Sequence, residues 1–158
     1  MKQRNLSRAE IYQKLMRYCS YQDRCSADIA KKIKLLGLDN EVLEDALNFL
    51  KEEGFLDDLR FAKSYVRGKF RSNKWGVAKI KEGLYAKKIS KAIIDEALLE
   101  LDKESYEKQL LNILLKKDKL LREEEPYERK QKLALYAHSK GYELELIWKT
   151  LKELNQYK

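Results

Sequence analysis

Apolar residues recur every three or four positions along nearly the whole chain, the spacing of one buried face of an α-helix. Ser7 and Glu10 form a capping box, which predicts that a first helix starts there. Ser26 is expected to cap a second helix, and Asp39 a third that ends before Gly54. The beginning of the chain therefore predicts three short helices joined by turns.

This pattern of apolar positions occurs three times. Five positions of the first round recur at an offset of 51 residues, and again at an offset of 104. The aligned sets are Ile29, Ile33, Leu38, Leu43 and Leu47, then Ile80, Leu84, Ile89, Ile94 and Leu98, then Leu133, Ala137, Tyr142, Ile147 and Leu151. Gly37 and Gly141 occupy matching turns. A period near 50 residues is typical of a helical repeat protein.

We therefore predict an all-α fold of three tandem three-helix repeats, each resembling a helix-turn-helix unit, over residues 1–56, 57–102 and 103–158. One such unit alone buries too little surface to be more than marginally stable. Neighbouring units are therefore expected to share apolar faces and to stack into an elongated, curved array. Residues 123–126 form an acidic insertion in the third unit and are interpreted as a solvated linker.

The composition agrees with a helical protein. Apolar residues make up 44% of the chain and charged residues 38%, with a single proline. Residues 1–10 do not look like a secretory signal, and no apolar run approaches the roughly 18 residues of a membrane span. A soluble, cytoplasmic protein without a membrane partner is expected. Cys19 and Cys25 are interpreted as reduced core residues rather than as a disulfide or zinc ligands.

The positive charge is concentrated in the middle of the chain. Residues 60–91 contain eleven lysines and arginines and one acid, Glu82, a net charge of +10, whereas the whole chain carries +8. Tyr65, Phe70 and Trp75 alternate with these bases and are expected in the core. The bases are expected to meet an anionic partner, either the phosphates of a nucleic acid or an acidic protein surface.

Groups that could support catalysis are few. The sequence has no glycine-rich phosphate loop, and His138 stands alone near a helix end, where the helix dipole favours it. Asp57 and Asp58 form a close carboxylate pair, but adjacent acids at a helix start are better explained as a cap. We therefore predict no enzyme activity, no catalytic residues, no metal site and no cofactor.

Residues 54–66 closely resemble the signature of the RecX family, the modulators of RecA recombinase. The matching residues are Gly54, Phe55, Leu56, Asp57, Asp58, Arg60, Phe61, Ala62 and Tyr65. Further matches lie at Arg24 and Ser26, and at Gly76 with the helix that follows it. The resemblance is strong over residues 8–102. One departure is Lys88, which stands in Lys-Lys-Ile where the family often has Lys-Gly-Ile.

The signature residues also have a physical interpretation as determinants of the fold. Gly54 supplies a left-handed turn, an aspartate caps the next helix, and Arg60 can pair with Asp57 one turn back. Phe55 and Leu56 are expected where two units meet. Phe61, Ala62 and Tyr65 are expected on the core face.

The resemblance implies a protein that binds the RecA–single-stranded DNA filament and inhibits the recombinase, ATPase and co-protease activities of RecA. Such a protein modulates homologous recombination, DNA repair and the SOS response, and is expected to be a monomer. The predicted contact residues are Arg67, Lys69, Arg71, Lys74, Lys79, Lys81, Lys87 and Lys88. The alternative is a stand-alone nucleic-acid-binding protein with helix-turn-helix-like units.

Overall fold

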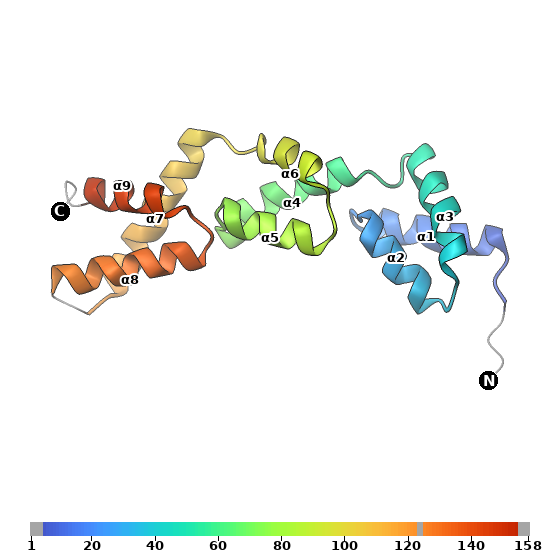
Figure 1. Ribbon diagram of the computed structural model, residues 1–158, viewed down its shortest axis with the longest axis horizontal. Coiled ribbons are helices and arrows are strands. Elements are labelled where there is room, and N and C mark those ends of the chain that lie inside the picture. Colours follow the sequence, from blue (N-terminus) through green and yellow to red (C-terminus); the bar gives the residue numbers. More distant parts are fainter. Residues whose placement is uncertain (1–4, 123–124, 155–158) are drawn as a thin grey trace.

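The computed structural model describes residues 5–122 and 125–154, and the regular secondary structure in these ranges is all α-helix. The helices are α1 (Arg8–Tyr21), α2 (Ser26–Leu35), α3 (Asn40–Glu52), α4 (Asp58–Asn73), α5 (Val77–Ala86), α6 (Lys91–Leu98), α7 (Lys103–Leu120), α8 (Pro126–Ser139) and α9 (Leu144–Leu154). They form three successive three-helix units in an elongated row (Figure 1). The prediction of an all-α fold of tandem three-helix repeats is confirmed. Glu123 and Glu124 of the expected linker lie outside the described residues.

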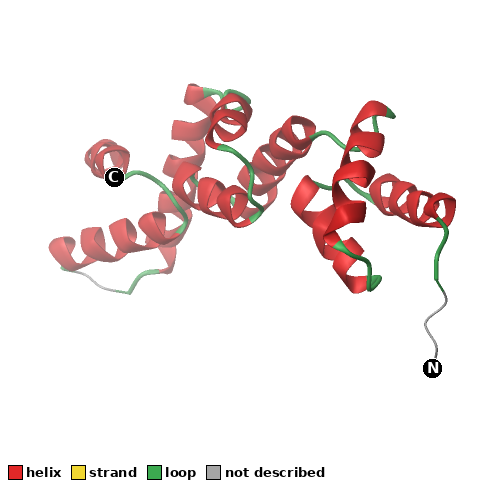
Figure 2. Cartoon of the chain, turned by 45° about the vertical axis from the view of Figure 1, so that its right-hand side comes forward, coloured by secondary structure: helices red, strands yellow, loops and turns green. Residues whose placement is uncertain are grey.

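Each unit has a separate hydrophobic core. Fully buried residues are Leu15 and Leu50 in the first, Ile80 and Ile94 in the second, and Leu110 and Ile147 in the third. Several residues contribute to a neighbour's core: Cys25 and Ala27 of the first unit pack with the second, and residues of the second unit pack against the third, namely Phe70, Val77 and Leu101. Neighbouring units therefore share apolar contacts, as expected, through a small number of side chains. The three units follow one another along the long axis of the molecule (Figure 1), and Figure 2 shows the same helices from a view turned by 45°.

The backbone repeats in the register that the apolar positions predicted. Gly37, Lys88 and Gly141 are related by the same offsets of 51 and 104 residues, and all three have positive φ angles, of 73°, 60° and 99°. Each follows the second helix of its unit and lets the chain turn into the third. A left-handed residue at this position is typical of a helix C-terminus, where glycine is preferred. In the second unit this position is Lys88, a residue with a side chain in the left-handed conformation.

Lys88→Gly is expected to stabilise the protein by about 1 kcal/mol. A non-glycine residue in the left-handed region costs about 1–2 kcal/mol, and the substitution removes this cost. Part of the gain is offset because glycine makes the unfolded chain more flexible. Urea unfolding followed by circular dichroism measures the change. Lys81→Gly is the matched control, since Lys81 lies inside α5. The control should instead destabilise by about 1 kcal/mol. A loss of stability in Lys88→Gly would contradict the interpretation.

The helix starts agree with the sequence at most positions. The Ser7 hydroxyl accepts the Glu10 amide hydrogen at 3.2 Å, as the capping box predicted. Ser26 was expected to cap α2, but it is the first helical residue, and Cys25 precedes the helix as its N-cap. The Asp28 carboxylate accepts the amide hydrogen of Cys25 at 3.1 Å. None of the described helices is long and apolar enough to cross a membrane.

Both cysteines are free and buried, as predicted. Burial raises the pKa of the Cys19 and Cys25 thiols, which keeps them protonated. They are therefore small core residues in this structure.

Candidate partner-binding surface

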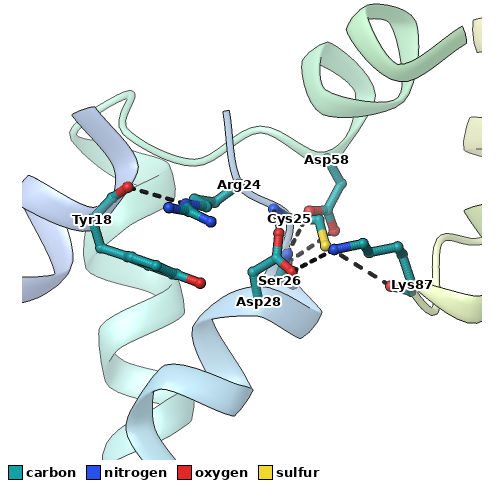
Figure 3. Close-up of polar contacts among 7 residues, drawn as sticks. All are labelled: Tyr18, Arg24, Cys25, Ser26, Asp28, Asp58 and Lys87. Carbon is teal, nitrogen blue, oxygen red and sulfur yellow. Dashed lines mark hydrogen bonds and ion pairs between the residues drawn. The ribbon is translucent and has the colours of Figure 1, made fainter. Parts of the chain in front are cut away.

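The two aspartates of the signature cap two different helices. Asp57 caps its own helix, α4, by accepting the Arg60 amide hydrogen at 3.0 Å. Asp58 faces the first unit, where its carboxylate accepts the Ser26 amide hydrogen at 2.8 Å and the Ser26 hydroxyl hydrogen at 2.9 Å (Figure 3). Asp58 therefore satisfies the start of α2 from outside that unit. The two family matches, around Ser26 and around Asp58, are parts of one junction.

The junction between the first and second units is closed by an ion pair. Lys87 Nζ lies 2.8 Å from Asp28 Oδ1, and the Cys25 thiol lies 4.0 Å from the Lys87 carbonyl oxygen (Figure 3). Burial alone would raise the pKa of Asp28, but hydrogen bonds from Lys87 and Cys25 outweigh it and hold that pKa below its ordinary value. The same hydrogen bond raises the pKa of Lys87. Lys87, predicted as a partner contact, thus holds two units together.

The remaining signature residues are structural. Arg60 was expected to pair with Asp57. Its guanidinium instead donates to the carbonyl oxygens of residues 54 and 55, at 3.3 and 3.2 Å, and approaches Asp23 at 3.7 Å. Phe55 and Leu56 pack in the first unit's core rather than between units. The predicted partner of Arg60 and the predicted place of Phe55 and Leu56 between units were therefore wrong.

The core-face residues of the signature lie where they were predicted. Phe61 and Ala62 are buried, and Tyr65 packs against the same core. The Tyr65 ring lies over Gly83, and its hydroxyl occupies the space that a Cβ on residue 83 would need. The absence of a side chain on Gly83 therefore allows the signature tyrosine to pack.

Several predicted basic residues make contacts inside the second unit. Arg67 forms a salt bridge with Glu100 at 3.0 Å, with about half of the arginine side chain exposed. The ammonium groups of Lys69 and Lys79 each lie 4.9 Å from the centre of the Trp75 ring. Such cation–π contacts orient the two lysines while leaving their charge unneutralised.

Other predicted bases form no salt bridge with any of the described residues. Arg71, Lys74 and Lys88 are exposed and Lys81 is half-buried, and none of the four forms a salt bridge there. Arg71 lies in the last turn of α4, and Lys74 is the C-cap residue that directly follows the helix. The structure thus leaves an uncompensated basic surface at the C-terminal end of α4.

The junction between the second and third units is built from backbone contacts. The Gly76 amide donates to the Lys140 carbonyl at 2.7 Å, and the Ala78 amide donates to the Gly141 carbonyl at 3.0 Å. A Cβ on Gly76 would lie 2.5 Å from both the carbon and the oxygen of Gly141. The two units therefore meet closely where neither residue carries a side chain.

Two buried tyrosines complete this junction. The Tyr106 hydroxyl accepts the Val77 amide hydrogen at 3.0 Å and donates to Glu143 at 2.9 Å. The Tyr142 hydroxyl donates to the Lys74 carbonyl at 3.1 Å and accepts from Gln109 at 2.8 Å. Burial raises the pKa of Tyr142 to about 12, so it remains a hydrogen-bond donor at neutral pH.

A basic groove of about 390 Å³, which was not predicted from the sequence, lies beside this junction. Phe70 of α4 and its C-cap residue Lys74 line one wall, and Tyr136 of α8 another. The third wall is one face of α7, formed by Ser105, Lys108, Gln109, Asn112, Ile113 and Lys116. The i, i+3 and i+4 spacing of these α7 residues is a signal that could have revealed a polar stripe. The ten acidic residues of the third unit, set against its thirteen lysines and arginines, concealed it.

The other candidates for chemistry remain apart. Within residues 5–122 and 125–154, no three histidine, cysteine or acidic side chains form a group that could hold a metal ion. His138 is exposed at the end of α8. The Asp57–Asp58 pair is used for capping two helices, so these carboxylates do not converge on one site.

The fold and this surface define a tandem three-helix repeat protein with a basic central unit. Residues 57–98 match the second three-helix domain of RecX, and residues 104–151 match the third. The chain belongs to the RecX family. Regulatory protein RecX of Prosthecochloris aestuarii is 32% identical over 137 residues, which cover 87% of this chain and 88% of that protein.

Other relatives are longer. Regulatory protein RecX of Clostridium beijerinckii is 36% identical over 129 residues, which cover 80% of this chain but 60% of that protein. The chain thus spans about 60% of the length of several clostridial relatives. A crystal structure of regulatory protein RecX superposes with a TM-score of 0.85 at 27% identity, covering 96% of this chain and 82% of that one. The crystal structure of RecX from Lactobacillus salivarius superposes with a TM-score of 0.87 at 21% identity, which shows a likeness of fold.

Proposed function

We propose that this protein binds the RecA–single-stranded DNA filament and inhibits the recombinase, ATPase and co-protease activities of RecA. It would thereby modulate homologous recombination, DNA repair and the SOS response. The observation that carries the proposal is the basic surface at the end of α4, where Arg71 and Lys74 form no salt bridge with any of the described residues. A nucleoprotein filament presents phosphates and acidic protein side chains together, and either attracts such a surface.

We also propose that the protein acts as a monomer in the cytoplasm, and that six lysines and arginines of the second unit contribute to the contact. These are Arg67, Lys69, Arg71, Lys74, Lys79 and Lys81. Lys88 is a further candidate, since it is exposed. Lys87 contributes indirectly, because its ammonium group is engaged by Asp28.

Reversing both charges in Arg71→Glu/Lys74→Glu is expected to abolish inhibition of the DNA-dependent ATPase of RecA at doses where the unmodified protein inhibits fully. Each reversal replaces attraction to an anionic surface with repulsion. The matched control is Lys14→Glu/Arg17→Glu, which changes the same two residue types at the same spacing on exposed positions of α1. The control should inhibit normally, and both variants should keep the helical circular-dichroism signal. Full inhibition by Arg71→Glu/Lys74→Glu would rule out this surface.

The second candidate function is stand-alone nucleic-acid binding, favoured by the concentration of bases next to short helices. A salt titration separates the two functions. A stand-alone binder should bind bare duplex or single-stranded DNA at submicromolar affinity with a steep salt dependence. A filament regulator should bind bare DNA weakly and act at low ratios to RecA.

A further inference from the structure

The groove between the second and third units has the chemistry of a site for an anion with many charges. Three lysines line it, Lys74 at the C-cap of α4 and Lys108 and Lys116 from α7, and no described residue of its lining is acidic. Lys117 and Lys140 extend the positive charge, since their ammonium groups lie 4.9 and 5.9 Å from the centre of the Tyr136 ring. Positive charge from two units and three helices therefore surrounds one cleft.

We propose that this groove binds a segment of single-stranded nucleic acid through its phosphates. The inference rests on the proposed function for the source of the strand, which is then the DNA of the filament. It adds Lys108 and Lys116 of the third unit to the contact. The sequence placed all contacts in the second unit.

The dimensions of the α7 wall suit a nucleic-acid strand. Lys108 and Lys116 are eight residues apart on one face, a rise of about 12 Å along the helix axis. In a B-form strand that distance corresponds to three or four phosphates, at about 3.4 Å each. Two separated ammonium groups on one wall, with Lys74 opposite, can therefore track a backbone rather than a single phosphate.

The polar groups of the groove favour a nucleic acid over an acidic peptide. Ser105, Gln109 and Asn112 offer a hydroxyl and two amides, which can hydrogen-bond to sugars and base edges. Carboxylates are best held by the two-pronged guanidinium of arginine, whereas lysine binds phosphate as a point charge. No arginine is among the described residues that line the groove. Phe70 and Tyr136 add aromatic surface for the bases.

Lys74 is held in position for this role by its neighbours. Its backbone is left-handed at the end of α4, with φ of 60°. Its carbonyl accepts the Tyr142 hydroxyl hydrogen, and that hydroxyl accepts in turn from the Gln109 amide of α7. The two walls of the groove are thus tied together without a ligand. A site organised in advance loses less conformational entropy when it binds.

The test measures binding of a fluorescein-labelled oligothymidine to the full chain by anisotropy, at several salt concentrations from low salt upward. Lys108→Gln/Lys116→Gln should bind about tenfold more weakly at low salt, because two phosphate contacts are lost. Its slope of log K against log salt should be shallower by about 1.4, at about 0.7 per contact on single strands. The matched control is Lys103→Gln/Lys119→Gln, with the same charge change at exposed positions of α7 outside the groove. Its affinity should stay near that of the unmodified protein.

Three results would overturn the inference. The first is that the unmodified protein shows no measurable binding of oligothymidine at low salt. The second is that both double variants lose the same amount of affinity for oligothymidine. The third is that polyglutamate displaces the labelled oligonucleotide as effectively as unlabelled oligothymidine does. Circular dichroism checks that both variants are folded. Inhibition of RecA ATPase by the unmodified protein is measured in parallel. If it is absent, the proposed function fails whatever the groove binds, whereas normal inhibition with equal losses in the two variants refutes the groove alone.

Discussion

Gly76→Ala is expected to lower the free energy of unfolding by about 3–5 kcal/mol, because overpacking and two broken inter-unit hydrogen bonds each contribute. The added methyl group would lie 2.5 Å from the Gly141 carbonyl atoms and 2.6 Å from the Tyr142 amide nitrogen. These are backbone atoms, which cannot turn aside as a side chain does. The third unit must therefore move away from the second, and the bonds from Gly76 to Lys140 and from Ala78 to Gly141 are lost.

The two tryptophans allow the units to be observed separately. Trp75 lies in the second unit and Trp148 on α9 of the third. Trp148→Phe leaves Trp75 as the only tryptophan and reports on the second unit, and Trp75→Phe leaves Trp148 and reports on the third. With Gly76 in place, the fluorescence transitions of these two variants in urea should nearly coincide, because neighbouring repeats stabilise each other. In Gly76→Ala the Trp148 transition should move to lower urea than the Trp75 transition. Coincident transitions in the variant would show that the junction does not couple the two units.

Gly68→Ala is the matched control for this substitution. Gly68 lies inside α4, is exposed, and has no atom within 4 Å of an added Cβ. Alanine is favoured over glycine in a helix by about 1 kcal/mol, so the control should gain stability. The same chemical change thus has opposite expected effects at two sites eight residues apart.

The fold could be predicted because its determinants are local. The apolar spacing, the caps and the turn residues each act within a few positions, and the matching glycines indicated the turns at residues 37 and 141. The left-handed conformation of Lys88, at the corresponding position of the second unit, was not predicted, because no glycine marks it. Local rules of this kind can be read from one sequence.

The junctions could not be predicted because they depend on how whole units are placed. Lys87 meets Asp28 from 59 positions away, and Tyr142 reaches Lys74 across 68. No periodicity links such residues. The net charge of a segment also averages over helix faces that differ. Lys116 lines the groove, Glu104 and Glu107 of α7 line a second depression beside α9, and Lys108 borders both. The basic segment was therefore found from the sequence, but the groove was not.

Asp28→Asn is expected to destabilise the protein by about 1–2 kcal/mol at pH 7, the size of a hydrogen bond to a charged group with part of the pair exposed to solvent. Asparagine has nearly the same shape and can still accept the Cys25 amide hydrogen. The variant therefore removes mainly the attraction to Lys87, 2.8 Å away. Urea unfolding followed by circular dichroism measures the loss, and a double-mutant cycle with Lys87→Met isolates the pair.

The exposed pair Lys91–Asp95 provides the matched control. It has the same residue types and the same 2.8 Å separation, but lies on the surface of α6. Asp95→Asn should change the stability little, because solvent screens such a pair. Equal losses in Asp28→Asn and Asp95→Asn would mean that the inter-unit pair contributes no more than a surface contact.

The pH dependence separates the charge from other effects of Asp28→Asn. The pKa of Asp28 lies below its ordinary value in the folded protein, since the hydrogen bonds from Lys87 and Cys25 outweigh its burial. Stability from this group is therefore complete above the unfolded pKa, about 3.9, and is lost as the pH falls through the folded value. The gap between the unmodified protein and Asp28→Asn should stay constant from pH 7 to about pH 5 and then narrow in acid. A gap that stays unchanged into strong acid would assign the loss to packing rather than to the ion pair that joins the first two units.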